Sequence, residues 1–223
     1  MAASFLRSSI GKKVLVALTG LMLLGFVIMH LLGNLTIFLG PDGLNAYALK
    51  LRHLGALLWV ARAILLVAVV VHIVFSIRLS IENRLARPER YAKLASRQST
   101  EASRGMWISG LMILAFLAYH LAHFTFGLTH PSLAHLTDAA GRHDIYTMVV
   151  ASFQSSTISA LYLVAMGLLC SHLSHGIAST CQTLGVNNEA TIPVVKRIGS
   201  ALAALIFVGY ASIPVSAWLG LLR

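Results

Sequence analysis

Charged residues are scarce in this chain: Asp, Glu, Lys and Arg make up 11% of its 223 residues, against about a quarter in an ordinary soluble domain. Hydrophobic residues make up 57%, and the mean hydropathy is +0.81. This balance excludes an ordinary soluble domain. Several apolar runs exceed the roughly 20 residues that cross a bilayer as a helix, so we expect an all-α integral membrane protein with a single membrane domain over residues 1–223.

Acidic residues are the rarest charged group. All seven fall in segments that we expect to be loops: Asp42, Glu82, Glu89, Glu101, Asp138, Asp144 and Glu189. Carboxylates inside the membrane typically mark the ion and proton pathways of transporters and pumps. Their absence from the apolar segments argues against an ion-coupled transporter.

Cysteine is equally sparse. Cys170 and Cys181 fall in one expected helix, about 16 Å apart at 1.5 Å per residue, which excludes a disulfide between them. No Cys-x-x-Cys-His motif occurs, so covalent attachment of a c-type haem is not supported.

Five transmembrane helices are expected, over about 14–39, 55–78, 106–128, 150–182 and 196–221. A Gly-Pro-Asp-Gly turn at 40–43, a basic stretch at 78–104 and a His- and Asp-containing loop at 130–144 separate the first four. Twelve of the seventeen Lys and Arg residues fall on the N-terminal side of the membrane, which places the N-terminus in the cytoplasm. Loops that border a membrane therefore explain the net charge of +10, and we expect no nucleic-acid partner.

Four of the five spans carry a histidine in their apolar stretch: His30, His72, His120 and His172. An ionisable side chain within a membrane helix is costly, so it indicates function by default. At 1.5 Å per residue, His30 and His120 lie about 12–14 Å from the outer ends of their helices. On the same basis, His72 and His172 lie about 9–15 Å from the cytoplasmic ends of theirs. Two pairs on facing helices could ligate two haems, whereas a tetrahedral zinc site gathers its ligands at one point. Gly33, close to His30, would make room for a flat macrocycle.

Two further histidines leave the choice of ligand open. His123 follows His120 by three residues, and His175 follows His172 by three, so each lies on the helix face of its neighbour. One member of each couple can be an axial ligand. The other could hydrogen-bond a propionate, a quinone or a carbonyl group.

Short motifs accompany this pattern along nearly the whole chain: SIGKK at 9–13, LTGL at 18–21, MHLLGN at 29–34, LYLV at 161–164 and SHLSHG at 171–176. The ordered set resembles the single-subunit, five-helix, di-haem cytochrome b membrane anchors of succinate:quinone oxidoreductases, the succinate dehydrogenases and fumarate reductases. The resemblance implies His30 and His120 as axial ligands of an outer, distal haem. It implies His72 and His172 as axial ligands of an inner, proximal haem.

The resemblance also implies a role. Two b-type haems would carry electrons between a cytoplasmic iron–sulfur subunit and a membrane quinone, with menaquinone the expected species. FAD and the iron–sulfur clusters would lie on partner subunits, where succinate and fumarate interconvert in the tricarboxylic acid cycle or in anaerobic respiration. This chain would then be a multi-pass subunit in the inner membrane of a bacterium, without dicarboxylate chemistry of its own.

The quinone site is harder to place from sequence. Four side chains near the outer start of the second span could bind a quinone headgroup or a haem propionate: Arg52, His53, Trp59 and Arg62. Arg62 could instead extend its charged end to the membrane surface. The basic stretch at 78–104 is either a docking surface for the iron–sulfur subunit or a topology signal.

Two other functions fit parts of the pattern. One is a di-haem cytochrome b of another quinone-linked dehydrogenase, such as a formate dehydrogenase or a hydrogenase. The other is a haem-free membrane transporter whose histidines serve helix packing.

Overall fold

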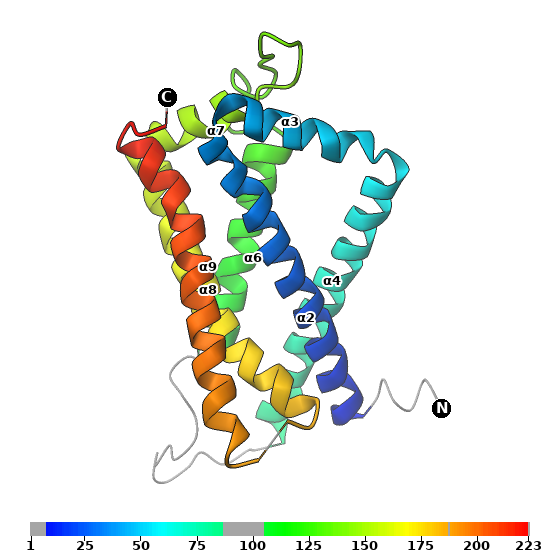
Figure 1. Ribbon diagram of the computed structural model, residues 1–223. Helices are drawn as coiled ribbons and strands as arrows, with labels where there is room; N and C mark the ends of the chain where they lie inside the picture. Colours follow the sequence, from blue (N-terminus) through cyan, green and yellow to red (C-terminus); the bar gives the residue numbers. More distant parts are fainter. Residues whose placement is uncertain (1–7, 87–104, 187, 223) are drawn as a thin grey trace. The chain divides into compact units, whose positions relative to one another are not determined.

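The computed structural model describes residues 8–86, 105–186 and 188–222, and most of them are helical (Figure 1). Within these ranges there is no β-strand, and one isolated β-bridge joins Thr137 and His143. The prediction of an all-α chain is therefore confirmed for the described residues.

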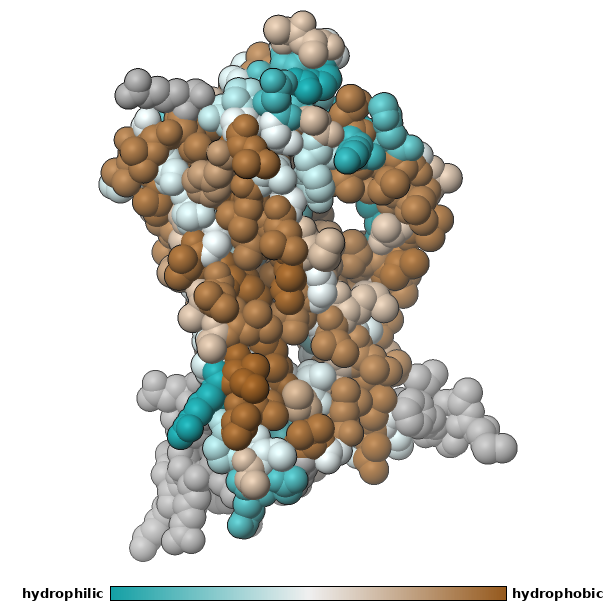
Figure 2. Space-filling model, in the orientation of Figure 1, coloured by the Kyte–Doolittle hydropathy of each residue, from teal (hydrophilic) through white to brown (hydrophobic). Residues whose placement is uncertain are grey.

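Among the described residues, five helical segments are long and apolar enough to cross a membrane. They contain the helices α2 (Ser9–Asn34), α4 (Ala56–Leu85), α6 (Met106–His120), α8 (Ser156–Thr183) and α9 (Thr191–Trp218). Hydrophobic side chains cover much of the face shown in Figure 2, as expected of a surface that meets lipid. These are the features of a multi-pass membrane protein, and the orientation of the N-terminus stays a prediction.

The segment after the first span departs from expectation. A 3-10 turn, η1 (Leu35–Leu39), follows α2, and the Gly-Pro-Asp-Gly expected as a turn instead begins the helix α3 (Gly40–His53). Gly40 has a φ of 84°, which glycine adopts without strain, and Pro41 sits in the first turn of α3 where its missing N–H is harmless. Asp42 therefore lies in α3, and Glu82 lies in α4; both were expected in loops.

The third and fourth spans also end differently from the expected limits of 106–128 and 150–182. A single π-helical turn, η2 (Leu121–Thr125), continues α6 directly after His120. The helix α7 (Ile145–Gln154) precedes α8, and Ser155 between them is extended, with φ −71° and ψ 118°. The Asp144 carboxylate caps α7 by accepting a hydrogen bond from the Thr147 N–H at 3.0 Å.

The described chain forms two compact units. Unit 1 comprises residues up to 25 with 63–110 and 171–203, and unit 2 comprises 26–62, 111–170 and the residues from 204. All five long helices contribute residues to both units. The prediction of a single membrane domain is not tested by this division.

The two units have different cores. The buried hydrophobic residues of the described part of unit 1 are all alanines: Ala17, Ala68, Ala178 and Ala203. The core of unit 2 is built around α7 and consists, apart from Ala217, of larger side chains: Ile37, Leu44, Tyr146, Val149, Val150, Phe153, Tyr162, Ile213 and Leu222. Close helix contacts through small residues are typical of membrane proteins, and unit 2 adds an aromatic core.

Candidate functional site

The structure brings the four span histidines together as two pairs, one within each unit. In unit 1, the ring centroids of His72 and His172 lie 6.4 Å apart with an angle of 64° between the planes. In unit 2, the ring centroids of His30 and His120 lie 6.0 Å apart at 84°. These are the partners that depth along the helices indicated from sequence.

The spacing of the rings matches that of two imidazoles on one metal. An imidazole nitrogen binds a metal at about 2 Å, and the ring centre lies about 1 Å behind the nitrogen, so two rings on opposite sides have centroids about 6 Å apart. T-shaped aromatic pairs have similar spacing, so distance alone does not identify a metal site. The hydrogen bonds of the rings supply a second criterion, because metal-ligating histidines usually donate their other N–H to a protein group.

Hydrogen bonds in unit 1 fix which nitrogen carries the proton. His72 Nδ1 lies 3.2 Å from the Val16 carbonyl oxygen, which can only accept, so the Nδ1–H donates to it; Thr19 Oγ1 lies at the same distance. His172 Nδ1 lies 3.1 Å from Ser109 Oγ, whose own O–H donates to the Met106 carbonyl at 3.1 Å. Nδ1 is thus the donor in both rings, and Nε2 carries the lone pair that a metal requires.

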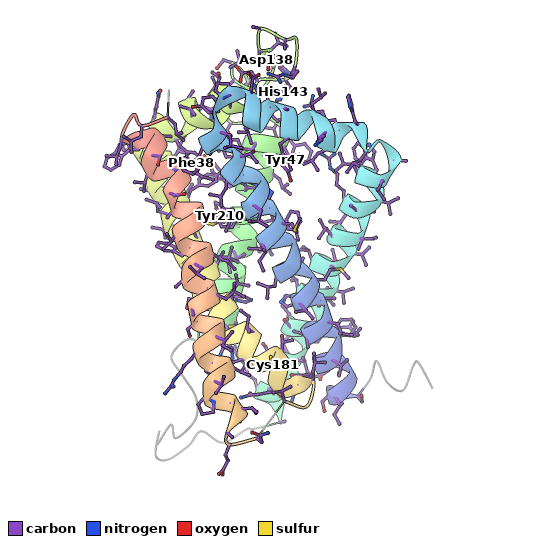
Figure 3. The ribbon with its side chains drawn as sticks, viewed as in Figure 1. Phe38, Tyr47, Asp138, His143, Cys181 and Tyr210 are labelled. Carbon is purple, nitrogen blue, oxygen red and sulfur yellow. The ribbon has the colours of Figure 1, made fainter. Side chains whose placement is uncertain are left out.

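Two glycines make room for the rings of unit 1. A Cβ atom added at Gly20 of α2 would lie 3.2 Å from His72 Cε1. One added at Gly110 of α6 would lie 3.7 Å from His172 Cε1. Gly33, which we expected to leave space for a macrocycle, instead faces Tyr47 of α3, whose ring fills the space beside it (Figure 3).

Aromatic rings surround the pair in unit 2. Phe26 stacks on His30 with centroids 5.3 Å apart, and Tyr210 of α9 lies 6.3 Å from the same ring. The Tyr210 hydroxyl, labelled in Figure 3, donates to the Val27 carbonyl at 2.8 Å. His120 Nδ1 lies 3.3 Å from the Tyr162 hydroxyl. These contacts hold both imidazoles from several helices.

The two neighbouring histidines differ in their environment. His123 is 2% exposed, and both of its ring nitrogens are hydrogen-bonded: Nδ1 with Tyr162 at 3.0 Å and Nε2 with Ser152 at 3.2 Å. Neither nitrogen is left for a metal, which favours His120 as the ligand. His175 is partly buried in α8, and the ring contact within unit 1 joins His72 to His172.

Few protein ligands gather at one point. No group of three or more His, Cys, Asp or Glu side chains that could hold a metal ion occurs within residues 8–86, 105–186 and 188–222. Pairs of histidines suit a metal whose other ligands come from a macrocycle. Cys170 and Cys181 are both free, as the sequence predicts.

The four quinone candidates are exposed and do not all come together. Arg62 lies over the Trp59 ring, 4.9 Å from its centroid, on α4. His53 lines an open hollow of about 410 Å³ along α3, together with Gly43, Ala46, Tyr47, Leu49 and Lys50. Sequence reasoning missed Tyr47 and Lys50, although both recur with His53 at helical spacing. Arg52 does not line the hollow.

A polar network ties α3 to the loop before α7. Arg142 Nε donates to Asp138 Oδ2 at 2.6 Å, and Arg142 also pairs with Asp42. Asn45, 1% exposed, donates to Asp138 and Asp144 at 3.2 and 3.1 Å. Desolvation opposes ionisation of Asp138, but hydrogen bonds from Arg142 and Asn45 outweigh it and hold the pKa of that carboxyl below its usual value.

Searches of protein-family models, curated proteins and solved structures each found no match to this chain. The function therefore has to be argued from the residues themselves.

Proposed function

We propose that this chain is the di-haem cytochrome b membrane anchor of a succinate:quinone oxidoreductase, with its N-terminus in the cytoplasm of a bacterium. The observation that carries the proposal is the presence of two histidine pairs, one in each unit. Their ring centroids lie 6.4 Å apart in unit 1 and 6.0 Å apart in unit 2. The order of the sequence motifs supports the choice of enzyme. The dicarboxylate chemistry belongs to a flavoprotein subunit with FAD and to an iron–sulfur subunit.

The residues of this chain would hold and tune two b-type haems. His72 and His172 would hold the inner one, and His30 and His120 the outer one. When bound, each haem supplies a one-electron carrier between the iron–sulfur subunit and the quinone. Hydrogen bonds donated by Nδ1 would orient the imidazoles of His72, His172 and His120 and raise their basicity, and the apolar surroundings would exclude water.

The hollow along α3 is the place that we propose for the quinone headgroup. Its volume of about 410 Å³ lies in the range of small-molecule sites, which combine apolar walls with a few polar groups. Lys50 and His53 supply hydrogen-bond donors there. We expect His53→Ala to raise the KM for quinone with unchanged haem content, and an unchanged KM would move the site elsewhere.

The test of the whole proposal is a reduced-minus-oxidised visible spectrum of the purified chain together with its haem content. We expect b-type bands and two haems per chain. Absence of b-type absorption would contradict the proposal and favour a haem-free transporter.

A second measurement identifies the enzyme. Membranes that contain the chain are treated with succinate, formate or hydrogen, and haem reduction is followed optically. Reduction by succinate, and co-purification of a flavoprotein with an iron–sulfur protein, are expected. Reduction by formate or hydrogen alone would assign the cytochrome to another quinone-linked dehydrogenase.

A further inference from the structure

His123 is buried and fully hydrogen-bonded, yet the ligand pairs do not use it. It belongs to a row of polar groups within unit 2 that begins at His120 and continues through Tyr162, His123 and Ser152 to the Met148 carbonyl. Of the three side chains between the ligand and this carbonyl, Ser152 and His123 are each 2% exposed and Tyr162 is 6% exposed. Buried polar groups are nearly always hydrogen-bonded. The donor and the acceptor of each hydrogen bond in the row can therefore be assigned in turn.

The direction of the row is set at its far end. The Met148 carbonyl can only accept, so the Ser152 O–H donates to it at 2.7 Å. Because the Ser152 hydroxyl donates its only proton to Met148, its oxygen can only accept from His123, and the Nε2–H of His123 donates to it at 3.2 Å. A neutral imidazole with its proton on Nε2 has an accepting Nδ1, so the Tyr162 O–H donates to His123 Nδ1 at 3.0 Å.

The same reasoning reaches the ligand. The Tyr162 oxygen has donated its proton to His123 and can accept from His120 Nδ1–H at 3.3 Å. His120 then carries its proton on Nδ1 and has a lone pair on Nε2. Both histidines of unit 1 have the same tautomer, set by the Val16 carbonyl for His72 and by the Ser109 hydroxyl for His172.

We propose that Tyr162, His123 and Ser152 form a one-way hydrogen-bond chain, anchored on the Met148 carbonyl, that positions His120 as an Nε2 ligand and sets the potential of the haem it holds. This inference rests on the proposed haem function. The three side chains are positioning residues, because each acts on the metal through His120.

The test is a redox titration of both haems in the purified full chain. Tyr162→Phe leaves His120 Nδ1–H without its acceptor, which makes the imidazole less basic and favours the reduced iron. We expect about a tenfold rise in the ratio of reduced to oxidised haem at fixed ambient potential, equivalent to about 59 mV for one electron. His123→Leu and Ser152→Ala should shift the same haem in the same direction by successively smaller amounts.

Controls separate positioning from general damage. Tyr119→Phe changes a ring that contacts both His123 and Tyr162 and has no place in the chain, so it should leave both potentials unchanged. Ser152→Thr keeps the hydroxyl that Ser152→Ala removes, so the haem at His120 should have the wild-type potential. The haem held by His72 and His172 serves as an internal reference.

The outcomes are distinguishable. Equal potentials in wild type and Tyr162→Phe, or equal shifts of both haems, would overturn the hydrogen-bond chain while leaving a di-haem protein. A wild-type chain without haem would instead overturn the proposed function. If Tyr162→Phe does not fold, Ser152→Ala against Ser152→Thr decides: a shift in the first and none in the second supports the chain, and no difference overturns it.

Discussion

The two histidine pairs lie in different surroundings. The pair in unit 1 lies near Gly20 and Gly110, and the described buried hydrophobic residues of that unit are all alanines. The pair in unit 2 is surrounded by rings: Phe26, Phe116, Phe124, Tyr162 and Tyr210. A site with small neighbours is sensitive to added atoms, whereas a site with large neighbours is sensitive to removed ones.

The hydrogen bonds differ in the same way. In unit 1, His72 reaches a backbone carbonyl directly, and His172 reaches one through the single hydroxyl of Ser109. In unit 2, three side chains separate His120 from the Met148 carbonyl. Unit 2 therefore offers more positions at which a substitution can change the hydrogen bonding of His120 while His120 itself is kept.

Removal of a ligand should have the largest effect and should show that the pairs are separate. His72→Ala or His172→Ala should leave one haem per chain, and His30→Ala or His120→Ala should leave the other. Haem content and the reduced-minus-oxidised spectrum measure this. His175→Ala is the matched control and should keep both haems; retention of both in His172→Ala would move that ligand to His175.

Removal of an aromatic side chain should damage unit 2. Phe153 is 5% exposed and packs edge-on against Tyr162 with centroids 4.9 Å apart. Phe153→Ala should cost about 3–5 kcal/mol of stability because a cavity replaces the ring. We expect loss of the haem at His30 and His120 at a lower temperature than that at His72 and His172, measured by absorbance on heating. Simultaneous loss would show that the units do not respond separately.

Addition of a methyl group should destabilise unit 1 more where less space is available. Gly20→Ala places a Cβ 3.2 Å from His72, whose ring is held by Val16, and should cost about 1–3 kcal/mol. Gly110→Ala meets His172 at 3.7 Å, an ordinary contact, and should be nearly neutral. Gly25→Ala, with no atom within 4 Å, should stabilise α2 by about 0.5–1 kcal/mol. Haem retention on heating ranks the three, and a different order would contradict the contact argument.

Acid should loosen the polar network of unit 2, and this effect should be the smallest. The pKa values of Asp138 and Asp144 are both lowered in the folded state, despite desolvation, by hydrogen bonds from Arg142 and Asn45 and from Thr147 and Asn45, respectively. Their stabilising contribution is fully present above the ordinary pKa of 3.8 and is lost as pH falls through the lower folded values. Protection factors for amide hydrogen exchange in the loop before α7 should therefore fall below about pH 4. Asp138→Asn should lower these protection factors at neutral pH as well, and equal protection factors in the two proteins would argue against the network.

The pairing of histidines could be predicted because depth along a helix is proportional to residue number. His30 opposite His120, and His72 opposite His172, needed only approximate helix ends and the rise per residue. The proton positions could not be predicted in this way. They depend on Ser109 and on other side chains whose contacts are set by the rotation of each helix, which the sequence does not fix.

The helix boundaries show the same limit. The long apolar runs predicted five spans, and five are present. The break at Ser155 was missed because the apolar residues before and after it were joined into one span, although the polar run Gln154, Ser155, Ser156 and Thr157 lies between them. The helical start at Gly40 was missed because Gly and Pro indicate a turn as readily as a helix N-terminus.

The ligand pairs interlace along the chain, and this has a consequence for biosynthesis. The order is His30, His72, His120, His172, so each pair skips one ligand of the other. Chains are made from the N-terminus, so once α6 has been synthesised the chain contains both histidines of the pair in unit 2 and one histidine of the pair in unit 1. The pair in unit 2 can therefore form before the pair in unit 1, which needs α8. On the proposed haem function, the cofactors would be inserted in that order, and no cut of the chain between α4 and α6 leaves either half with a complete pair.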